Sequence, residues 1–281
     1  MTEPQHATAD PPILGCKEVS KSFGAVQALY KVDFEVRAGE VMALVGDNGA
    51  GKSTLIKGIA GIHAFDEGEI HFEGEPTTIH GPRDAARLGI EIVYQDLALA
   101  DNLDVVGNMF LGRERLTGIV LDESSMERSA RETLDSLSVT TLRSVRQKVA
   151  GLSGGQRQAV AVAKSVMWES RVVILDEPTA ALGVAQTRQV LDLVRRLADR
   201  GIGVVIISHN LHDVFEVADR ITVLRLGQTV DVYTKQDVTQ QQVVHAITAG
   251  TLKHVPGMVD DAPLPLAEAL AEVAPSEETR L

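Results

Sequence analysis

A glycine-rich segment, GDNGAGKST at Gly46–Thr54, places the strongest restriction on the fold of this chain. It follows a compact apolar run, Val41–Val45, and precedes a segment with the amphipathic spacing of a helix. Glycines let such a loop wrap with its N–H groups pointing inward, and the N-terminus of the next helix adds partial positive charge. A strand, a loop of this spacing and a helix in succession predict a phosphate-binding loop.

The chemistry of this loop assigns roles to its residues. We expect Lys52 to reach the β- and γ-phosphates of ATP, and the Ser53 hydroxyl to ligate Mg²⁺. A glycine-rich turn that merely precedes a lysine is the alternative, and the strand–loop–helix context makes it the weaker one. The other residues of the cradle would be Gly46, Asp47, Asn48, Gly49, Ala50, Gly51 and Thr54.

A second apolar run, from Arg171 to Leu175, ends in the carboxylates Asp176 and Glu177. In a protein with a phosphate loop, the first such carboxylate holds Mg²⁺ directly or through water. The second can polarise the attacking water as a general base. Without the loop at Gly46, a charged strand end would be the better interpretation.

Short apolar strands alternate with longer helical patterns through most of the chain, which predicts an α/β fold with a largely parallel sheet. Val41–Val45, Val172–Leu175 and Val204–Ile207 are expected to be strands covered on both faces. Val32, Phe34 and Val36 alternate with polar residues, which predicts a half-exposed antiparallel strand. Residues 98–168 contain few strand-like runs, and the helical spacing of Met126, Ala130, Leu134 and Leu137 predicts a helical insertion.

Composition limits the class of protein. The chain has 281 residues, 44% of them hydrophobic, enough for a core in one large or two small domains. Its 27 basic and 39 acidic residues give a net charge of −12, which disfavours general binding of nucleic acid without excluding a local basic patch. The sole cysteine, Cys16, cannot form an intrachain disulfide, which suits a reducing compartment, and we expect it to be half-buried in a strand.

The two ends differ from the middle of the chain. The N-terminus lacks the basic flank and apolar stretch of a signal peptide, and no apolar run approaches the roughly 18 residues needed to span a bilayer. Any work at a membrane therefore requires docking to another chain. Residues 1–12, and the acidic, proline-containing residues 251–281, are expected to be solvated tails, with a short helix at Leu264–Val273 as one possibility for the second.

The sequence GLSGGQ at Gly151–Gln156 identifies a family. It resembles the signature of the ABC-type ATPases, and the resemblance covers roughly residues 13–250. The family implies a P-loop NTPase (RecA-like) core with an antiparallel β subdomain and an α-helical insertion. Ser153, Gly154, Gly155 and Gln156 would form a second anion cradle at a helix N-terminus. The resemblance implies that two copies dimerise head to tail, so that each signature caps the ATP held by the other copy.

Three further positions match the family, and one departs from it. Gln95 matches the glutamine that links Mg²⁺ and water to the helical insertion, His209 matches the histidine that contacts the γ-phosphate, and Phe23 matches the aromatic under the adenine. On its own, a glutamine in a loop would be interpreted as solvated, a histidine at a strand end as structural, and a phenylalanine in a strand as part of the core. Gly183 stands where the family usually has an aspartate that couples the two ATP sites, which puts the tightness of that coupling in doubt.

The segments 89–114 and 207–225 resemble the ATPases of ribose, xylose and fructose importers. The resemblance implies ATP-driven import of a monosaccharide by a peripheral homodimer at the cytoplasmic face of the inner membrane. The expected partners are permease subunits and, indirectly, an extracytoplasmic sugar-binding protein. No nucleic acid is expected as a partner. The apolar group Leu103, Val105, Val106, Met109 and Phe110 lies where the family docks its permease, although packing within the insertion also explains it. The alternatives are an importer of amino acids, peptides or ions, a soluble ABC ATPase of translation or repair, and a small-molecule kinase.

Overall fold

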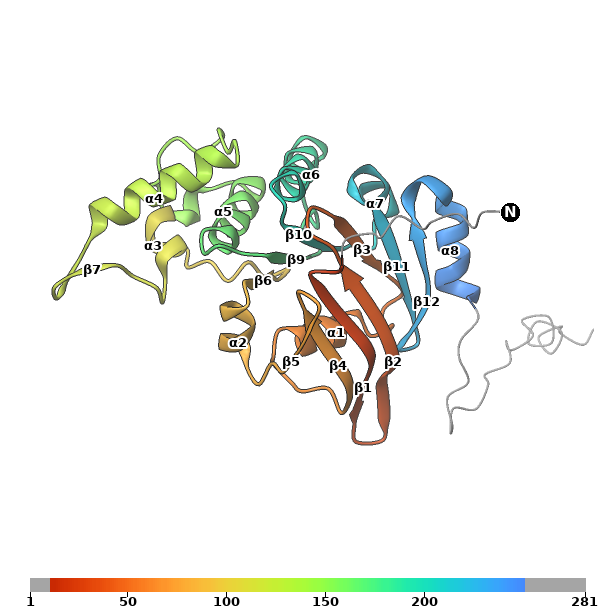
Figure 1. Ribbon diagram of the computed structural model, residues 1–281. Helices are drawn as coiled ribbons and strands as arrows, with labels where there is room; N and C mark the ends of the chain where they lie inside the picture. The colour runs from red at the N-terminus through yellow and green to blue at the C-terminus, as the bar shows by residue number, and fades with distance from the viewer. Residues whose placement is uncertain (1–10, 251–281) are drawn as a thin grey trace, which may run out of the picture.

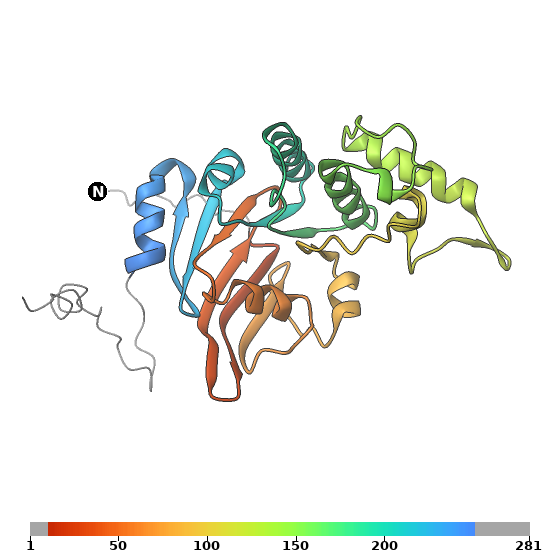
Figure 2. The same ribbon diagram turned by 180° about the vertical axis from the view of Figure 1, so that it is seen from behind.

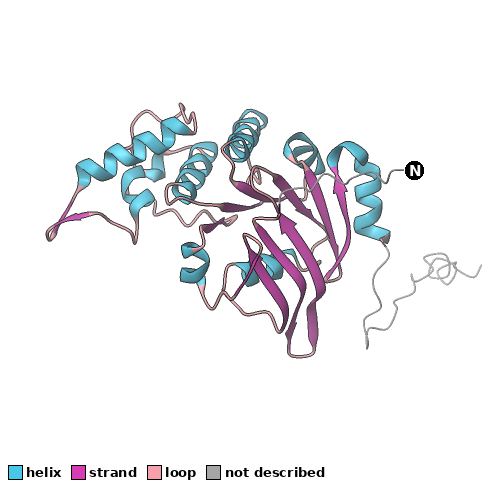
Figure 3. Cartoon of the chain, in the orientation of Figure 1, coloured by secondary structure: helices cyan, strands magenta, loops and turns pink. Residues whose placement is uncertain are grey.

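The computed structural model describes residues 11–250, so the predictions for the two tails, including the short helix at Leu264–Val273, lie almost entirely outside the described residues. A six-stranded sheet forms the centre, a four-stranded antiparallel sheet lies against it, and a group of helices extends from one edge (Figure 1). Figure 2 gives the same arrangement from behind, and Figure 3 separates the helices from the strands.

The six-stranded sheet has the order β12-β11-β3-β10-β9-β6. From β11 through β6 neighbouring strands are parallel, while β12 pairs antiparallel with β11. The prediction of a largely parallel sheet is confirmed. The strands are β3 (Val41–Val45), β6 (Ile90–Val93), β9 (Val172–Asp176), β10 (Gly203–Ile207), β11 (Arg220–Arg225) and β12 (Gln228–Thr234).

Both faces of this sheet are buried, which explains why its central strands are continuous apolar runs. Side chains alternate along β3: Val41 and Ala43 belong to the core shared with the helices, and Met42 belongs to the core shared with the antiparallel sheet. The helices on the first face are α6 (Val184–Asp199), α7 (Leu211–Val217) and α8 (Gln240–Ala249), the last preceded by a short 3₁₀ turn at Lys235–Asp237.

The antiparallel sheet has the order β2-β1-β4-β5. In β2 the side chains of Val32, Phe34 and Val36 are buried and alternate with more exposed ones, as predicted for a half-exposed strand. Cys16 lies in β1 and is buried rather than half-buried, and this burial raises the pKa of its thiol to about 12. The strands are β1 (Leu14–Phe23), β2 (Val26–Val36), β4 (Glu67–Phe72) and β5 (Glu75–Thr77).

Helix α1 (Lys52–Ile59) packs between the two sheets, because Leu55, Ile56 and Ile59 share one core with residues of both. The short helix α2 (Pro82–Arg87) leads into β6. This arrangement of a parallel core, an antiparallel sheet and a helical extension is the predicted fold class, which is confirmed.

The helical extension occupies the segment between β6 and β9. It contains α3 (Val105–Phe110), α4 (Glu123–Ser136), a 3₁₀ turn at Val149–Gly151 and α5 (Gly154–Val166). It also contains a two-stranded hairpin that the sequence did not predict, formed by β7 (Leu116–Thr117) and β8 (Val120–Leu121). Val105, Val106, Met109 and Phe110 are fully buried here and Leu103 is partly buried, so packing within the extension accounts for four of the five apolar side chains.

None of the helices within residues 11–250 has the length and apolarity needed to cross a bilayer. Because the five strands from β11 to β6 are parallel, their carboxyl ends and the loops that follow them meet at one edge of the sheet. In open α/β sheets, ligands bind outside this edge.

Candidate functional site

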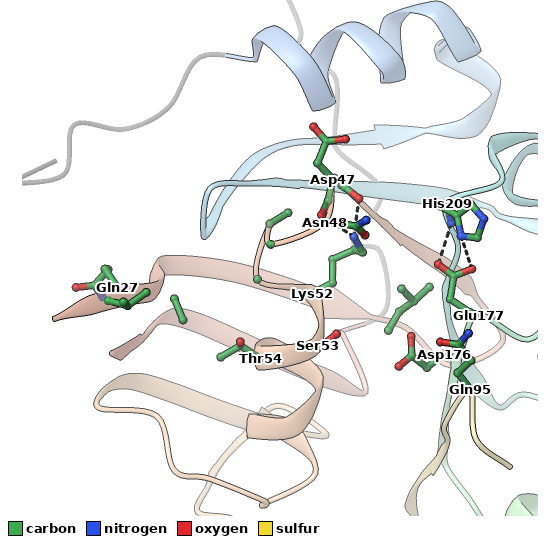
Figure 4. Close-up of a pocket in the computed structure, with 17 residues that line it drawn as sticks. Gln27, Asp47, Asn48, Lys52, Ser53, Thr54, Gln95, Asp176, Glu177 and His209 are labelled. Atoms are coloured by element: carbon green, nitrogen blue, oxygen red, sulfur yellow. Dashed lines mark hydrogen bonds and ion pairs between the residues drawn. The ribbon is translucent and has the colours of Figure 1, made fainter. Parts of the chain in front are cut away.

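The carboxyl edge of the six-stranded sheet carries a pocket of about 710 Å³ (Figure 4). The loops that follow β3, β6, β9 and β10 all contribute to it. Most of the predicted site residues are brought together here: Gly46, Asp47, Asn48, Gly49, Ala50, Gly51, Lys52, Ser53, Thr54, Gln95, Asp176, Glu177 and His209.

The glycines of the phosphate loop are required by its backbone. Gly51 has a φ of 102°, and a Cβ there would lie 2.7 Å from the Leu29 side chain. At Gly46 a Cβ would lie 2.2 Å from the carbonyl oxygen of Leu224. The loop therefore lies so close to β2 and β11 that only glycine fits at these two positions. Gly51 is also the N-cap of α1 and provides no side-chain cap, so the first amides of the helix face the pocket as an anion site.

Lys52 extends across this loop. Its Nζ donates to the carbonyl oxygens of Gly46 at 2.5 Å and Asp47 at 2.9 Å. Burial lowers the pKa of Lys52, and the negative charges of Glu177, Asp47 and Asp176 oppose that shift. The ammonium group is thus held at the centre of the cradle, where a phosphate group would be its strongest partner.

Asp176 ends β9 at the floor of the pocket. Burial, followed by the adjacent charge of Glu177, raises the pKa of Asp176, while Lys52 and Lys57 act in the opposite direction. A divalent cation at this point would offset both causes of the shift. Mg²⁺ takes oxygen ligands and is commonly bound by one or two carboxylates together with substrate phosphates and water. The hydroxyl of Ser53 and the carboxylate of Asp176 fit that chemistry, and Gln95 lines the same pocket.

Glu177 and His209 form a pair at the other side of the pocket. The Nδ1 atom of His209 lies 2.8 Å from Oε2 of Glu177, and the backbone N–H of His209 donates to Oε1 at 3.1 Å. Glu177 has a φ of 50°, a left-handed conformation that is uncommon outside glycine. Its N–H donates to the carbonyl of Ile207 at the end of β10, which fixes this turn to the neighbouring strand.

Phe23 is not among the residues that line the pocket. It ends β1, its side chain is half-exposed, and its ring lies 5.4 Å from the ring of His63. Its partner across the hairpin is Val26, which does line the pocket. Because directly opposed residues share one face of a sheet, Phe23 lies beside the mouth of the pocket.

The signature segment lies outside this pocket, at the N-terminus of α5. Ser153 caps the helix by accepting from the backbone N–H of Gln156 at 3.3 Å, and the Gln156 side chain accepts from the N–H of Ser153 at 2.9 Å. Gln156 also donates to the carbonyl of Thr141 at 2.6 Å. Its amide is therefore engaged within the subunit, while Ser153 and Gly154 are exposed.

Four lining residues were missed by sequence reasoning: Val26, Gln27, Ala28 and Ile207. Val26 to Ala28 belong to β2, whose approach to the phosphate loop is a tertiary contact without a local sequence pattern. Ile207 could have been found, since it immediately precedes the segment that carries His209.

The fold and the pocket together define a nucleotide-binding protein with a phosphate loop. Residues 29–180 match the family model described as ABC transporter. The chain belongs to this family and is an ATPase whose activity is coupled to transport. Membership excludes the small-molecule kinase alternative.

Sequence relatives cover nearly the whole described chain. A fructose import ATP-binding protein of Rhizobium meliloti is 48% identical over 85% of this chain and 95% of its own length. A xylose/arabinose import ATP-binding protein of Sulfolobus acidocaldarius is 46% identical over 86% and 96%. A ribose import ATP-binding protein of Lacticaseibacillus paracasei is 42% identical over 81% of this chain, which spans 45% of that longer protein.

Solved structures agree in fold. A nucleotide-free ATP-binding cassette of an ABC transporter has a TM-score of 0.70 and 27% identity, covering 80% of this chain and 92% of its own. A cassette in its ADP conformation has a TM-score of 0.71 and 26% identity, covering 85% and 96%.

Proposed function

We propose that this chain is the ATP-hydrolysing subunit of an importer for a monosaccharide. The observation that carries this proposal is the meeting of the phosphate loop, the paired carboxylates Asp176 and Glu177, and His209 in one pocket. The relatives named for import of fructose, xylose or arabinose, and ribose favour a monosaccharide over an amino acid, a peptide or an ion.

The phosphate end of the pocket binds the nucleotide. Lys52 and the loop amides bind the β- and γ-phosphates, and Ser53, Asp176 and Gln95 are the residues that would hold Mg²⁺. When bound, Mg²⁺ neutralises charge on the transferring phosphoryl group. Phe23 is paired with Val26, which lines the pocket, so the Phe23 ring lies where it can stack on the base of the nucleotide.

Hydrolysis uses the opposite side of the pocket. Glu177 orients the attacking water and accepts its proton, while His209 holds the Glu177 carboxylate and contacts the γ-phosphate. Catalysis by such a site consists mainly of positioning and charge stabilisation. Gln95 connects this side to the helical extension, because it lies between β6 and α3.

A second copy of the chain completes the site. Ser153 and Gly154 are exposed at a helix N-terminus away from the subunit's own pocket, which supports their use on ATP held by another copy. A related cassette bound to ADP and phosphate is dimeric, at 25% identity and a TM-score of 0.66, covering 79% of this chain and 98% of its own. Gly183, the N-cap of α6, presents no side chain to such a partner, while Val184 is 90% exposed.

The permease contacts the helical extension. The β7–β8 hairpin projects from the body of the molecule (Figures 1 and 2), and its side chains include Ile119, which is 97% exposed, and Val120, which is 66% exposed. Arg115 anchors the hairpin, since it donates to Ser125 and Ser129 and lies 5.2 Å from the Phe110 ring. Four exposed apolar side chains on a fixed hairpin are typical of a surface that another protein covers. A small pocket of about 160 Å³ lies where β6 meets the helical extension and is lined by Glu91, Met109, Leu111, Arg113, Lys164 and Trp168.

In this proposal the complex lies at the cytoplasmic face of the inner membrane, and residues 13–250 form one ATPase domain. The permease and a sugar-binding protein select the sugar. The test is to purify the chain from membranes together with its partners and to measure ATP turnover with a panel of monosaccharides, amino acids and peptides. Stimulation by one monosaccharide is expected. Stimulation by an amino acid or a peptide instead would overturn the substrate class, and tight binding of nucleic acid without a permease would favour a soluble ABC ATPase.

A further inference from the structure

A buried hydrogen bond joins the two loops that carry Glu177 and His209. The hydroxyl of Thr179 donates to Oδ2 of Asp213 at 2.7 Å. Thr179 lies in the turn that begins at Glu177, and Asp213 lies in the first turn of α7, which follows His209. The two side chains are 9% and 3% exposed. Neither lines the nucleotide pocket.

This buried bond differs in strength from the exposed contact beside it. The His209 side chain is 76% exposed, so its ring contact with the more buried Glu177 side chain is open to solvent on one side and restrains the two loops only weakly. A hydrogen bond to a buried carboxylate is stronger than a neutral one, and its loss leaves a buried charge without its partner. The Thr179–Asp213 bond therefore adds a buried restraint to the backbone hydrogen bonds that Glu177 makes with Ile207 and His209.

The turn that carries Glu177 also needs such a restraint. Glu177 and Ala181 both have positive φ, at 50° and 60°, and Thr179 lies between them. Non-glycine residues persist in this conformation only where the surrounding structure holds them. The carbonyl of Thr179 accepts from the N–H of Leu182 at 3.2 Å, so the same residue closes the turn and ties it to α7.

We propose that Thr179 and Asp213 are positioning residues that hold Glu177 and His209 in register for hydrolysis. The proposal rests on the ATPase reaction assigned above. Because neither side chain lines the nucleotide pocket, breaking their bond should affect turnover and leave nucleotide binding unchanged. Displacement of a catalytic group by about 1 Å can cost on the order of 100-fold in rate, so the effect is measurable even if the loops shift only slightly.

The experiment compares Thr179→Val, Thr179→Ser and a matched control in the full chain. Valine keeps the shape of threonine and removes the hydroxyl, while serine retains the hydroxyl. The control is Thr222→Val, since Thr222 is also buried and donates its hydroxyl to the Met42 sulfur at 3.3 Å. The measurements are kcat and KM for Mg-ATP, the Kd of a non-hydrolysable ATP analogue, and Tm.

We expect Thr179→Val to lower kcat by about tenfold or more with an unchanged Kd. Thr179→Ser should restore most of the turnover, and Thr222→Val should lower Tm without changing kcat. A Thr179→Val variant with a lowered Tm and the wild-type kcat would overturn the proposal and leave the bond a purely structural one. Equal losses in the valine and serine variants would also overturn it, since the hydroxyl would then be irrelevant.

Asp213→Asn provides a second variant that is read against the wild type: kcat should fall several-fold with an unchanged Kd, and a wild-type kcat would contradict the proposal. The amide is close in size, and its oxygen still accepts from Thr179 without the negative charge, so kcat should fall by less than in Thr179→Val. The double variant should be no slower than Thr179→Val alone, because residues that act as one unit are not additive. Independent, additive losses would contradict the proposal. A wild-type protein that binds Mg-ATP without hydrolysing it would instead refute the proposed ATPase reaction.

Discussion

His209 holds both oxygens of the Glu177 carboxylate: its ring Nδ1 lies 2.8 Å from Oε2, and its backbone N–H donates to Oε1 at 3.1 Å. The two residues follow neighbouring parallel strands, β9 and β10, and the N–H of Glu177 donates to the last residue of β10. The orientation of the proposed general base is therefore set by the strand that carries its histidine. This arrangement suits a carboxylate that must point at one water molecule beside the γ-phosphate.

Glu177→Gln should bind ATP and hydrolyse it about 100-fold or more slowly, because glutamine keeps the size of the side chain and cannot accept a proton. ATP-bound dimers should then accumulate. The measurements are phosphate release under saturating Mg-ATP and the oligomeric state by light scattering with and without ATP. Unchanged turnover would refute the assignment of Glu177 as the general base.

Local patterns in the sequence were sufficient for the strands and for much of the pocket. The run Val41–Val45, its loop, and the positions of Gln95, Asp176 and His209 at or just after the ends of other strands determine the site, because parallel strands bring their carboxyl ends together. The parts that could not be predicted depend on tertiary contacts. Thr179 and Asp213 are 34 residues apart in the sequence.

Two further features of the structure have the same explanation. The contribution of Val26 to the pocket depends on how the β1–β2 hairpin meets the phosphate loop. The engagement of Gln156 with Thr141 depends on a loop that connects α4 to the signature and has no regular pattern of its own. In both cases the residue type is known from the sequence, whereas the residue that it contacts depends on the folded structure.

Mixing two inactive variants should restore activity. Lys52→Ala should disable the phosphate loop of its own subunit, and Ser153→Arg should block the signature that the partner's ATP needs. A heterodimer of the two has one site in which both defects meet and one intact site. ATP-dependent dimerisation and turnover should therefore exceed those of either variant alone, which can be measured over a series of mixing ratios. A mixture that never dimerises with ATP would count against the head-to-tail arrangement.

Glu40→Gln should change how stability depends on pH. Glu40 is buried, and this burial raises its pKa above the usual 4.5, although the N–H and charge of Arg37 and the charge of Arg220 oppose the shift. The folded protein therefore retains this proton at a pH where the unfolded chain has lost it. The contribution of Glu40 to the free energy of unfolding is fully present below about 4.5 and is lost as the pH rises through the folded-state value.

Glutamine has no proton to lose, so the free energy of unfolding of the wild type, minus that of Glu40→Gln, should fall as the pH rises across this window. Urea denaturation of both proteins from acid to neutral pH measures the difference. A difference that stays constant would mean that Glu40 ionises in the folded protein as it does in the unfolded chain.

Ile119→Asp, in the β7–β8 hairpin, should separate transport from ATP hydrolysis. Ile119 is almost fully exposed, so its replacement should leave the Tm of the isolated subunit nearly unchanged. The same surface buried against a permease would lose about 1.5–3 kcal/mol of apolar contact and would gain a buried charge. Turnover of the isolated subunit should therefore equal the wild-type value, while sugar uptake and co-purification with the permease should fall on the order of tenfold or more.

Val184→Asp is the matched control, because Val184 is similarly exposed at the start of α6 and lies outside the helical extension. It should retain the permease and, if the signature acts across a dimer, should weaken ATP-dependent dimerisation instead. Normal uptake by Ile119→Asp would show that the permease docks elsewhere.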